Sequence, residues 1–493
     1  MNCVSAPQEV LKGRLTYIDA YPTAFPAYGY GNYAGYDDAM PQSDAQTSRW
    51  SSTEGSSYGS WLRYFYSGNI YYYGGKYYRF RVRPVVAYDT PIDFLNLVLE
   101  AFYDCCRRKR TSQACIDYMQ IANEDLPALA HELYTGTYQP GVSTCFLVKY
   151  PKYREVFAAC FRDRIVHHFL FIILNPYFEE RFTKQGNVSF NCRKGFGTLA
   201  AQRAVAKAMR EATDGYRRKA WIYRGDIVSF FMSIDKRILW RKLEPFINTH
   251  YNGPYLAQVI AVARVTVFHC PEHNCVFNTD PAEWKDHIET LKSLFGNTDH
   301  FGMPIGNLTT QLFVNFFMSF FDEFVIAWFS TRGYRVYYVR FVDDFIVICV
   351  SRTVLKVFVK SARVFMYAEL GIELHTDKYH FQPASHGVMF VGAYIKFGRI
   401  YLSNRTIARF TERVYGFNEL LNNKEQVTLT DLCRIEQVVN SYLGFCRDKR
   451  TYSIRRAILF TFCRAFYEYF YIKGHYDGIR LRTAHKPIKT TAS

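Results

Sequence analysis

Two adjacent carboxylates, Asp343 and Asp344, stand between two apolar runs rich in β-branched and aromatic residues. The segment, residues 338–348, is YVRFVDDFIVI, which predicts two short strands joined by a tight turn with both carboxylates at its tip. Two like charges held this close are unfavourable unless a cation neutralises them, and a divalent metal ion does so best. By itself the pattern is a moderate signal for a metal-binding hairpin, because Asp-Asp pairs are also common in ordinary turns.

A third carboxylate ends an upstream strand pattern. Residues 221–231, WIYRGDIVSFF, form an apolar run that is interrupted by Asp226. A strand-end aspartate beside a hairpin-borne pair is suited to two Mg²⁺ ions, for which Mn²⁺ can substitute; such ions activate a 3′-hydroxyl and stabilise a leaving pyrophosphate. Taken alone, Asp226 is better explained as a cap of the segment that follows the strand.

A loop that contains glycine and proline, residues 302–311, lies between the two aspartate segments. It leads into a long apolar helix, which we expect from about residue 311 to residue 329. Gly306 permits close backbone approach to a nucleotide or template base, while Asn307 and Gln311 supply amide donors and acceptors. A loop before a helix is a weak signal, and its place between the two aspartate segments strengthens it.

Together these segments resemble a known family. Asp226, the Gly306 loop, residues 341–344 (FVDD) and Lys378 stand in the order of the palm motifs of reverse transcriptases. Residues 389–394, MFVGAY, resemble the primer-grip hairpin of that family. The resemblance extends from about residue 92 to residue 470.

More narrowly, the loop resembles that of the reverse transcriptases of diversity-generating retroelements and their close bacterial or phage relatives. It is IGNLTTQ at residues 305–311, where the retroelement pattern is Ile-Gly-Asn-x-x-Ser-Gln. Thr310 replaces that serine, and Phe341 replaces the commoner tyrosine. Neither departure removes a metal ligand.

The resemblance implies an α+β fold: a right-hand polymerase with fingers, a palm of antiparallel sheet plus helices, and a helical thumb. The implied divisions are a Tyr/Gly/Ser-rich leader at 1–89, N-terminal helices at 90–144, fingers and palm at 145–403, a helical thumb at 404–475 and a basic tail at 476–493. From local pattern we expect Thr90 to cap a helix that begins at Pro91. We also expect a fingers hairpin at 146–157, thumb helices at 406–421, 432–443 and 459–471, and disorder at 480–482 and 485–489.

The resemblance also implies roles for individual residues. Asp226 and Asp343 would bridge the two Mg²⁺ ions, with Asp344 as an outer ligand and the Ile227 carbonyl completing the coordination. Phe231 would block a ribose 2′-hydroxyl, and the alternative for it is core packing. Nucleotide contacts would come from Arg154, Lys149, Lys152, Gly306, Asn307 and Gln311, the primer grip from Phe390, Val391, Gly392 and Tyr394, and the proton for the leaving pyrophosphate from Lys378.

Composition agrees with a protein that binds nucleic acid. The net charge is +17 and aromatic residues make up 18% of 493 residues, which suits a groove that follows a phosphate backbone and stacks on bases.

The thirteen cysteines match no zinc-ribbon spacing and no secretory leader precedes them, so we expect reduced thiols and a cytoplasmic protein. The stretch HCPEHNC at 269–275 is better explained as part of an insertion than as a zinc knuckle. We expect no membrane-spanning segment, because polar residues interrupt the helix after Gln311.

The leader differs from the rest of the chain. Residues 64–80, YFYSGNIYYYGGKYYRF, mostly belong to the set obtained when the adenines of AAY codons are replaced. They resemble the end of the lectin-like variable proteins that such retroelements diversify. Lys76 does not fit the set, and a low-complexity aromatic tail remains the alternative.

Two other functions stay open. One is a reverse transcriptase of another bacterial lineage, of the retron or antiviral type, and the other is a non-catalytic palm that binds nucleic acid. The three carboxylates and Phe231 argue against the second, and the Asn307 to Gln311 loop favours the retroelement type over the first. The implied partners are template RNA, primer or cDNA, dNTPs and a basic helical accessory protein.

Overall fold

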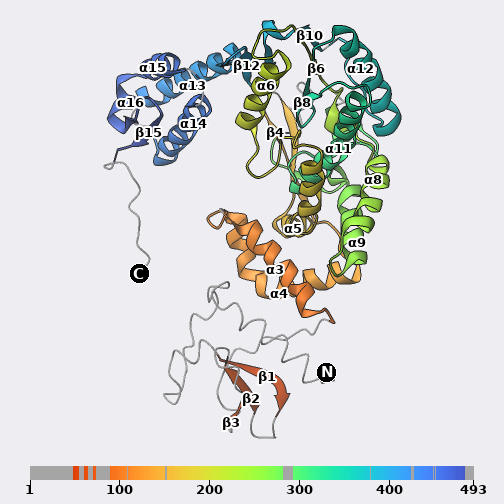
Figure 1. The fold of residues 1–493 in the computed structure, drawn as a ribbon. Helices are drawn as coiled ribbons and strands as arrows, with labels where there is room; N and C mark the ends of the chain where they lie inside the picture. Colours follow the sequence, from red (N-terminus) through yellow and green to blue (C-terminus); the bar gives the residue numbers. More distant parts are fainter. Residues whose placement is uncertain are drawn as a thin grey trace. The chain divides into compact units, whose positions relative to one another are not determined.

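The structure is a computed structural model, drawn as a ribbon in Figure 1. The chain divides into two compact units. One unit comprises Met1–Tyr177 and Asp235–Phe313, and the other comprises Phe178–Ile234 and Val314–Ser493. The structure describes residues 89–107, 109–149, 153–280, 292–377, 379–423, 427–447, 449 and 451–482, together with the backbone of three strands within residues 48–73.

Those three strands form a small antiparallel sheet in the leader. They are β1 (Ser48–Glu54), β2 (Ser60–Tyr64) and β3 (Ile70–Tyr73), paired in the order β1-β2-β3. Tyrosine and tryptophan favour strands, which agrees with the lack of helical periodicity in this segment. The resemblance to a lectin-like protein stays a prediction.

The first helix begins differently from our expectation. α3 (Ile92–Cys106) has Pro91 at its N-cap, without a side-chain capping bond. Thr90 is therefore not the cap; its Oγ1 lies 3.2 Å from His131 Nδ1 on α4 (Gln113–Thr135). The Thr90 hydroxyl, which the local sequence predicted to cap the helix, is hydrogen-bonded to the His131 imidazole instead.

The hairpin predicted at 146–157 is confirmed, and we call it the fingers hairpin, although its place in a fingers domain stays a prediction. β4 (Ser143–Val148) pairs antiparallel with β5 (Arg154–Ala158), and β7 (Cys275–Phe277) joins β4 in parallel. A strand from the insertion therefore completes the fingers sheet. The other elements here are α5 (Phe161–Lys184), which continues into the second unit, α8 (Lys236–His250), α9 (Leu256–Phe268), and the 3₁₀ turns η1 (Pro271–His273) and η3 (Leu294–Gly296).

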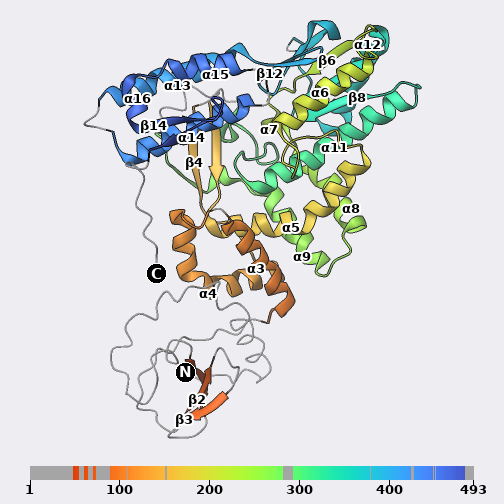
Figure 2. The same cartoon turned by 60° about the vertical axis from the view of Figure 1, so that its left-hand side comes forward.

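The second unit is built on a four-stranded antiparallel sheet, which we call the palm sheet. Its order is β10-β6-β9-β8, from β6 (Trp221–Gly225), β8 (Tyr337–Phe341), β9 (Asp344–Cys349) and β10 (His380–Pro383). Ile222, Ile346 and Ile348 of one face pack with α6 (Thr198–Ala212). On the other face Phe345 meets Phe321 of α11 (Leu308–Ser330) at a ring distance of 5.1 Å. This sheet with helices on both faces (Figure 2) confirms the α+β class.

Helix α11 begins three residues earlier than predicted and is mostly apolar. By length and composition alone it could cross a membrane, with a mean hydropathy of 1.5 over its best window, but 72% of that window is buried inside the protein. Such burial is typical of a core helix, because a helix that is hydrophobic all round must be covered. The remaining elements before the C-terminal helices are α7 (Phe230–Ser233), α12 (Arg352–Phe365), the π-helix η4 (Met366–Leu370), η5 (Ala384–His386), β11 (Val388–Phe390), β12 (Ala393–Lys396) and β13 (Arg399–Leu402).

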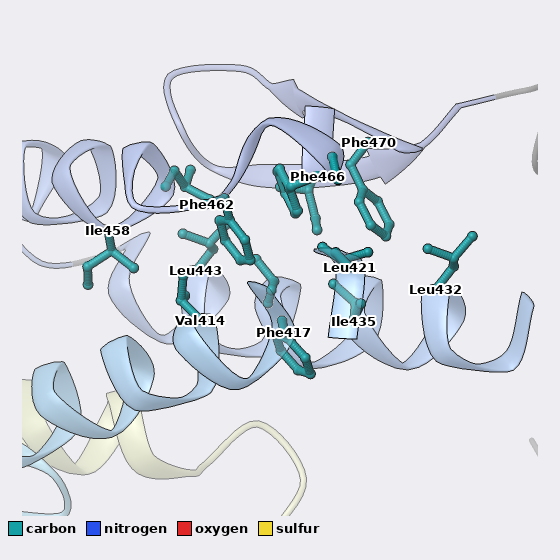
Figure 3. Packing of buried hydrophobic residues seen from close by; sticks show 14 of the residues in the cluster. Val414, Phe417, Leu421, Leu432, Ile435, Leu443, Ile458, Phe462, Phe466 and Phe470 are labelled. Atoms are coloured by element: carbon teal, nitrogen blue, oxygen red, sulfur yellow. The ribbon is translucent and has the colours of Figure 1, made fainter. Parts of the chain in front are cut away.

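The C-terminal helices share a hydrophobic core of their own (Figure 3). Val414, Leu443 and Phe466 contribute from three different helices and are fully buried. The helices are α13 (Asn404–Asn422), α14 (Leu429–Arg447), α15 (Tyr452–Phe460) and α16 (Arg464–Tyr469). The single helix predicted over 459–471 is wrong: the chain breaks after Phe460 and becomes extended at Phe470.

The segment expected to be disordered at 480–482 is instead largely part of a hairpin. β14 (Phe470–Lys473) pairs with β15 (Gly478–Leu481). The Asn440 amide of α14 accepts from Ile479 N at 2.8 Å and donates to Ile479 O at 3.0 Å, so β15 is fastened to the helix. The other segment expected to be disordered, 485–489, lies outside the described residues, as does all of 483–493.

Candidate active site

The predicted Asp-Asp hairpin forms, but the two aspartates occupy different positions in it. β8 and β9 pair as far as Phe341↔Asp344, so Val342 and Asp343 make a two-residue turn. Asp343 therefore stands at the tip, while Asp344 is the first residue of β9. The expectation that both lie at the tip is correct only for Asp343.

The turn residue Val342 has an unusual backbone conformation. Its φ is 59°, a left-handed value that is strained for a β-branched side chain. The Asn191 side-chain oxygen accepts from the Val342 amide at 2.9 Å, and Arg340 Nη1 donates to the Val342 carbonyl at 3.2 Å. Both backbone groups are therefore held, and this fixes the path of the chain into Asp343.

A buried network supports Arg340 in turn. The Arg340 and Asp322 side chains are both 0% exposed and form a two-point ion pair, with Nε–Oδ1 at 2.7 Å and Nη2–Oδ2 at 2.6 Å. Arg340 also donates to Asn315 Oδ1 at 3.1 Å, which accepts from Ser189 Oγ at 2.7 Å. Burial acts to lower the pKa of Arg340, but the Asp322 carboxylate raises it above its ordinary value.

Sequence reasoning missed this network. Its signal was a charged residue inside each of two apolar segments, Arg340 in a strand and Asp322 in a helix, because a buried charge requires a partner. No local pattern pointed to Asn191. It lies 151 residues before Val342, whose amide donates to its side-chain oxygen.

The palm sheet brings Asp226 to the same end as the hairpin tip. The β6–β9 register runs to Gly225↔Phe345, and one further residue sets Asp226 across from Asp344. Gly225 is needed for this pairing, since a Cβ there would lie 2.4 Å from the Phe345 ring. The Asp226 carbonyl accepts from His375 N at 2.9 Å, which anchors the chain beyond the strand.

Arg224, which sequence reasoning did not single out, binds both oxygens of Asp344. The distances are 2.7 Å from Nε to Oδ1 and 2.9 Å from Nη2 to Oδ2. Burial raises the pKa of Asp344 to about 6; Arg224 opposes this rise, and the neighbouring Asp343 and Asp226 add to it. Three neighbouring carboxylates, all with hard oxygen donors, are suited to Mg²⁺.

Phe231 and its neighbour Phe230 have different environments in the short helix α7. Phe230 is 3% exposed and belongs to the core, whereas Phe231 is half-buried, and the two rings meet edge to face at 5.4 Å.

The side chain of Ile227 is buried, and its backbone forms a bridge with Leu374. The gating role of Phe231 and the metal contact of the Ile227 carbonyl stay predictions.

In the first unit, the Gly306 loop packs against the fingers strand β5. Gly306 has a φ of 130°, and a Cβ there would lie 2.5 Å from the Phe157 carbonyl oxygen. Asn307 is 5% exposed, and its Oδ1 accepts from Ala159 N at 3.4 Å. Gln311, on the first turn of α11, is exposed. Protein contacts therefore account for Gly306 and Asn307, and Gln311 is the loop side chain presented to solvent.

Two of the predicted basic residues lie at the tip of the fingers hairpin. Lys149 follows β4, Arg154 begins β5, and both are exposed. Lys152, between them, and Lys378, the predicted proton donor, lie outside the described residues.

The predicted primer-grip residues lie on the hairpin of β11 and β12. Val391 and Gly392 form its two-residue turn, with φ values of 43° and 79°. The Val391 carbonyl accepts from Gln202 of α6 at 2.8 Å. Phe390 is buried and Tyr394 is half-buried. The turn is therefore fixed to the second unit, and its contact with a primer stays a prediction.

Comparison with known proteins identifies a family. Residues 149–395, half of the chain, match the family described as reverse transcriptase (RNA-dependent DNA polymerase). The matched span begins after β4 and includes β5, the three carboxylates and all but the last residue of the β11–β12 hairpin. Among curated proteins, none matches this chain.

Solved telomerase structures are distantly similar. Apo telomerase from Candida tropicalis has 11% identity and a TM-score of 0.42, covering 66% of this chain and 59% of that chain. Telomerase from Candida albicans, in complex with a TWJ fragment of telomeric RNA, has 12% identity and a TM-score of 0.37, covering 68% and 59%. This chain thus spans about three fifths of the telomerase chains it matches.

Proposed function

The chain belongs to the reverse transcriptase family, the RNA-directed DNA polymerases, and from this we propose that it copies an RNA template into cDNA by two-metal nucleotidyl transfer for a diversity-generating retroelement. The main support for two-metal nucleotidyl transfer is that Asp226, Asp343 and Asp344 lie at the same end of the palm sheet. The retroelement part rests on the sequence of the Gly306 loop and of the leader.

The donor set fits a pair of Mg²⁺ ions. Asp226 and Asp343 would hold both ions, and the Ile227 carbonyl would complete the coordination with another hard oxygen. When bound, the ions would lower the pKa of the primer 3′-hydroxyl and offset the charge of the triphosphate. Asp344, whose two oxygens bind Arg224, would act as an outer group that keeps the hairpin in register.

The residues at the fingers tip and on α7 would select the nucleotide. Lys149 and Arg154 are exposed cations, as contacts to a triphosphate require. Phe231 is the half-buried ring five residues past Asp226, and we propose that it excludes a ribose 2′-hydroxyl.

Phe231→Val is expected to raise incorporation of rNTPs relative to dNTPs by at least tenfold, because a smaller side chain leaves room at the 2′ carbon. Single-nucleotide extension with matched rNTP and dNTP series measures the ratio. Phe230→Leu is the matched control: it alters the buried neighbour and is expected to lower stability without changing the ratio. An unchanged ratio in Phe231→Val would make Phe231 a packing residue.

The retroelement proposal predicts errors concentrated opposite template adenines. The active site would hold the templating adenine loosely enough for a wrong dNTP to compete. Gln311 is the exposed amide of the loop, so it is the side chain we expect to contact the template nucleotide. A basic helical accessory protein and the cognate template RNA would complete the working assembly.

Sequencing of cDNA made on a defined RNA, with cognate template RNA and candidate accessory protein supplied, tests this prediction. We expect a several-fold excess of errors at adenines, altered by Gln311→Ala. Asn307→Ala is the contrast, because its buried amide binds Ala159; it should lower stability and overall extension without a selective change at adenines. Errors spread evenly over the four template bases would reject the retroelement role and leave a reverse transcriptase of another lineage.

A further inference from the structure

We propose that Cys270, Glu272, His273 and Asp299 bind a divalent ion of the zinc type, at a site distinct from the palm carboxylates. One ligand atom from each residue is available, and these four atoms all lie within 4.8 Å of one another. All four residues belong to the first unit, so the cluster is independent of the three palm aspartates.

A tight turn brings the first three ligands together. Cys270 precedes η1, His273 N donates to the Cys270 carbonyl at 3.2 Å, and Asn274 N donates to the Pro271 carbonyl at 3.1 Å. The chain then enters β7, which pairs with β4. The turn is therefore held on a regular sheet, as a metal site with defined geometry requires.

The fourth ligand comes from a distant part of the sequence. Asp299 stands in a turn closed by a bond from Phe301 N to the Thr298 carbonyl at 2.8 Å, and Phe301 forms a bridge with Asp235. The spacing of the cysteines matches no zinc ribbon, and a sequence search limited to residues 269–275 cannot find a ligand 26 residues beyond His273.

Two features of the present contacts favour a bound cation. Glu272 Oε2 is buried and, among the described residues, has no hydrogen-bond partner. His273 Nε2 lies 2.8 Å from Asp299 Oδ1, a pair that a metal would bridge in place of the shared proton. In a tetrahedral zinc site with bonds of about 2.0–2.3 Å, the ligand atoms lie about 3.3–3.8 Å apart. The most distant atoms of the cluster would therefore approach by roughly an ångström, and the His273–Asp299 pair would separate by about half an ångström.

The donor types and the charge balance favour zinc. One thiolate, one imidazole and two carboxylates form a mixed set that suits a borderline-soft ion better than Mg²⁺ or Ca²⁺. Three anionic ligands on a divalent ion leave one negative charge. Lys236, which is 0% exposed, places its Nζ 3.2 Å from Cys270 Sγ and 3.1 Å from the His269 carbonyl, so its ammonium group would neutralise that charge.

Four protein ligands leave no open position, so the ion would be structural. It would join the turn before β7 to the segment that leads into the Gly306 loop, two parts of the first unit that are separated in sequence. Loss of the ion is therefore expected to destabilise the first unit without removing a catalytic group.

Metal analysis of the purified full-length chain tests the proposal. After dialysis against a weak chelator, we expect about one zinc per chain. Cys270→Ser, His273→Gln and Asp299→Asn should each lose it, whereas Cys433→Ser, which alters a half-buried cysteine of α14, and Asp343→Ala should retain it. Zinc should also raise the Tm of the chelated wild type and not that of Asp299→Asn.

Cobalt provides a readout that needs no variant. Added to the metal-free wild type, Co²⁺ should give the thiolate-to-metal charge-transfer absorption and the visible bands of a tetrahedral site, and zinc should abolish them. Absence of the thiolate band, or zinc retained equally by Cys270→Ser and Asp299→Asn as an adventitious ion only, would overturn the proposal. Variants that fail to fold leave the cobalt spectrum of the wild type as the deciding result.

Discussion

Asp226→Ala and Asp343→Ala are each expected to lower RNA-templated primer extension by about a thousandfold or more. Each change removes an anionic oxygen ligand from ions that would supply several kcal/mol of transition-state stabilisation. Extension of a labelled DNA primer on an RNA template, with Mg²⁺ and then Mn²⁺, measures the loss. Asp344→Asn should cost less, because Arg224 binds both oxygens of that residue.

Asp117→Ala is the control, since this exposed carboxylate of the first unit accepts a local bond from Gln113. A second readout does not depend on activity. Mg²⁺ should raise the Tm of the wild type by relieving repulsion among the three carboxylates, and this rise should vanish in Asp226→Ala. Undiminished extension in both aspartate variants would show that the palm carboxylates do not carry the reaction.

The core of this site was predictable because its signals are local and ordered. The apolar runs on both sides of Asp343 and Asp344 predicted the hairpin, and the strand pattern that ends in Asp226 predicted its neighbour. The β6–β9 register brings Asp226 beside the hairpin. Gly225 permits this register, because the absence of a side chain there makes room for the Phe345 ring. The sequence showed the glycine but not the ring that would occupy its space.

The errors of prediction arise where distant residues decide a local structure. Thr90 has the composition of an N-cap, yet His131 of another helix binds its hydroxyl. The aromatic run at 459–471 fits either a helix or a strand by composition. The last residues of this run belong to the β14–β15 hairpin instead of a helix. The Asn440 amide helps to form that hairpin, because it binds both backbone groups of Ile479.

The buried Arg340–Asp322 pair that supports the β8–β9 hairpin is a further case in which distant residues decide a local structure. Its loss is expected to have the second large effect. Arg340→Met should leave the Asp322 carboxylate buried without its cation, and the expected loss is about 3–5 kcal/mol of stability. The variant should show a strongly lowered Tm. Arg335→Met is the matched control: Arg335 pairs with Glu211 while 72% exposed, and loss of such a surface pair costs at most about 1 kcal/mol.

The double variant Arg340→Met/Asp322→Leu separates stability from positioning. Replacing both charges by apolar side chains of similar size removes the unpaired carboxylate, so most of the lost Tm should return. Extension should nevertheless stay low, because the Val342 carbonyl has lost its donor Arg340 and the strained turn that carries Asp343 is no longer held from both sides. If stability and extension recover together, Arg340 contributes only to packing, and the backbone of Val342 keeps its conformation without it. If stability alone recovers, the network positions the catalytic hairpin.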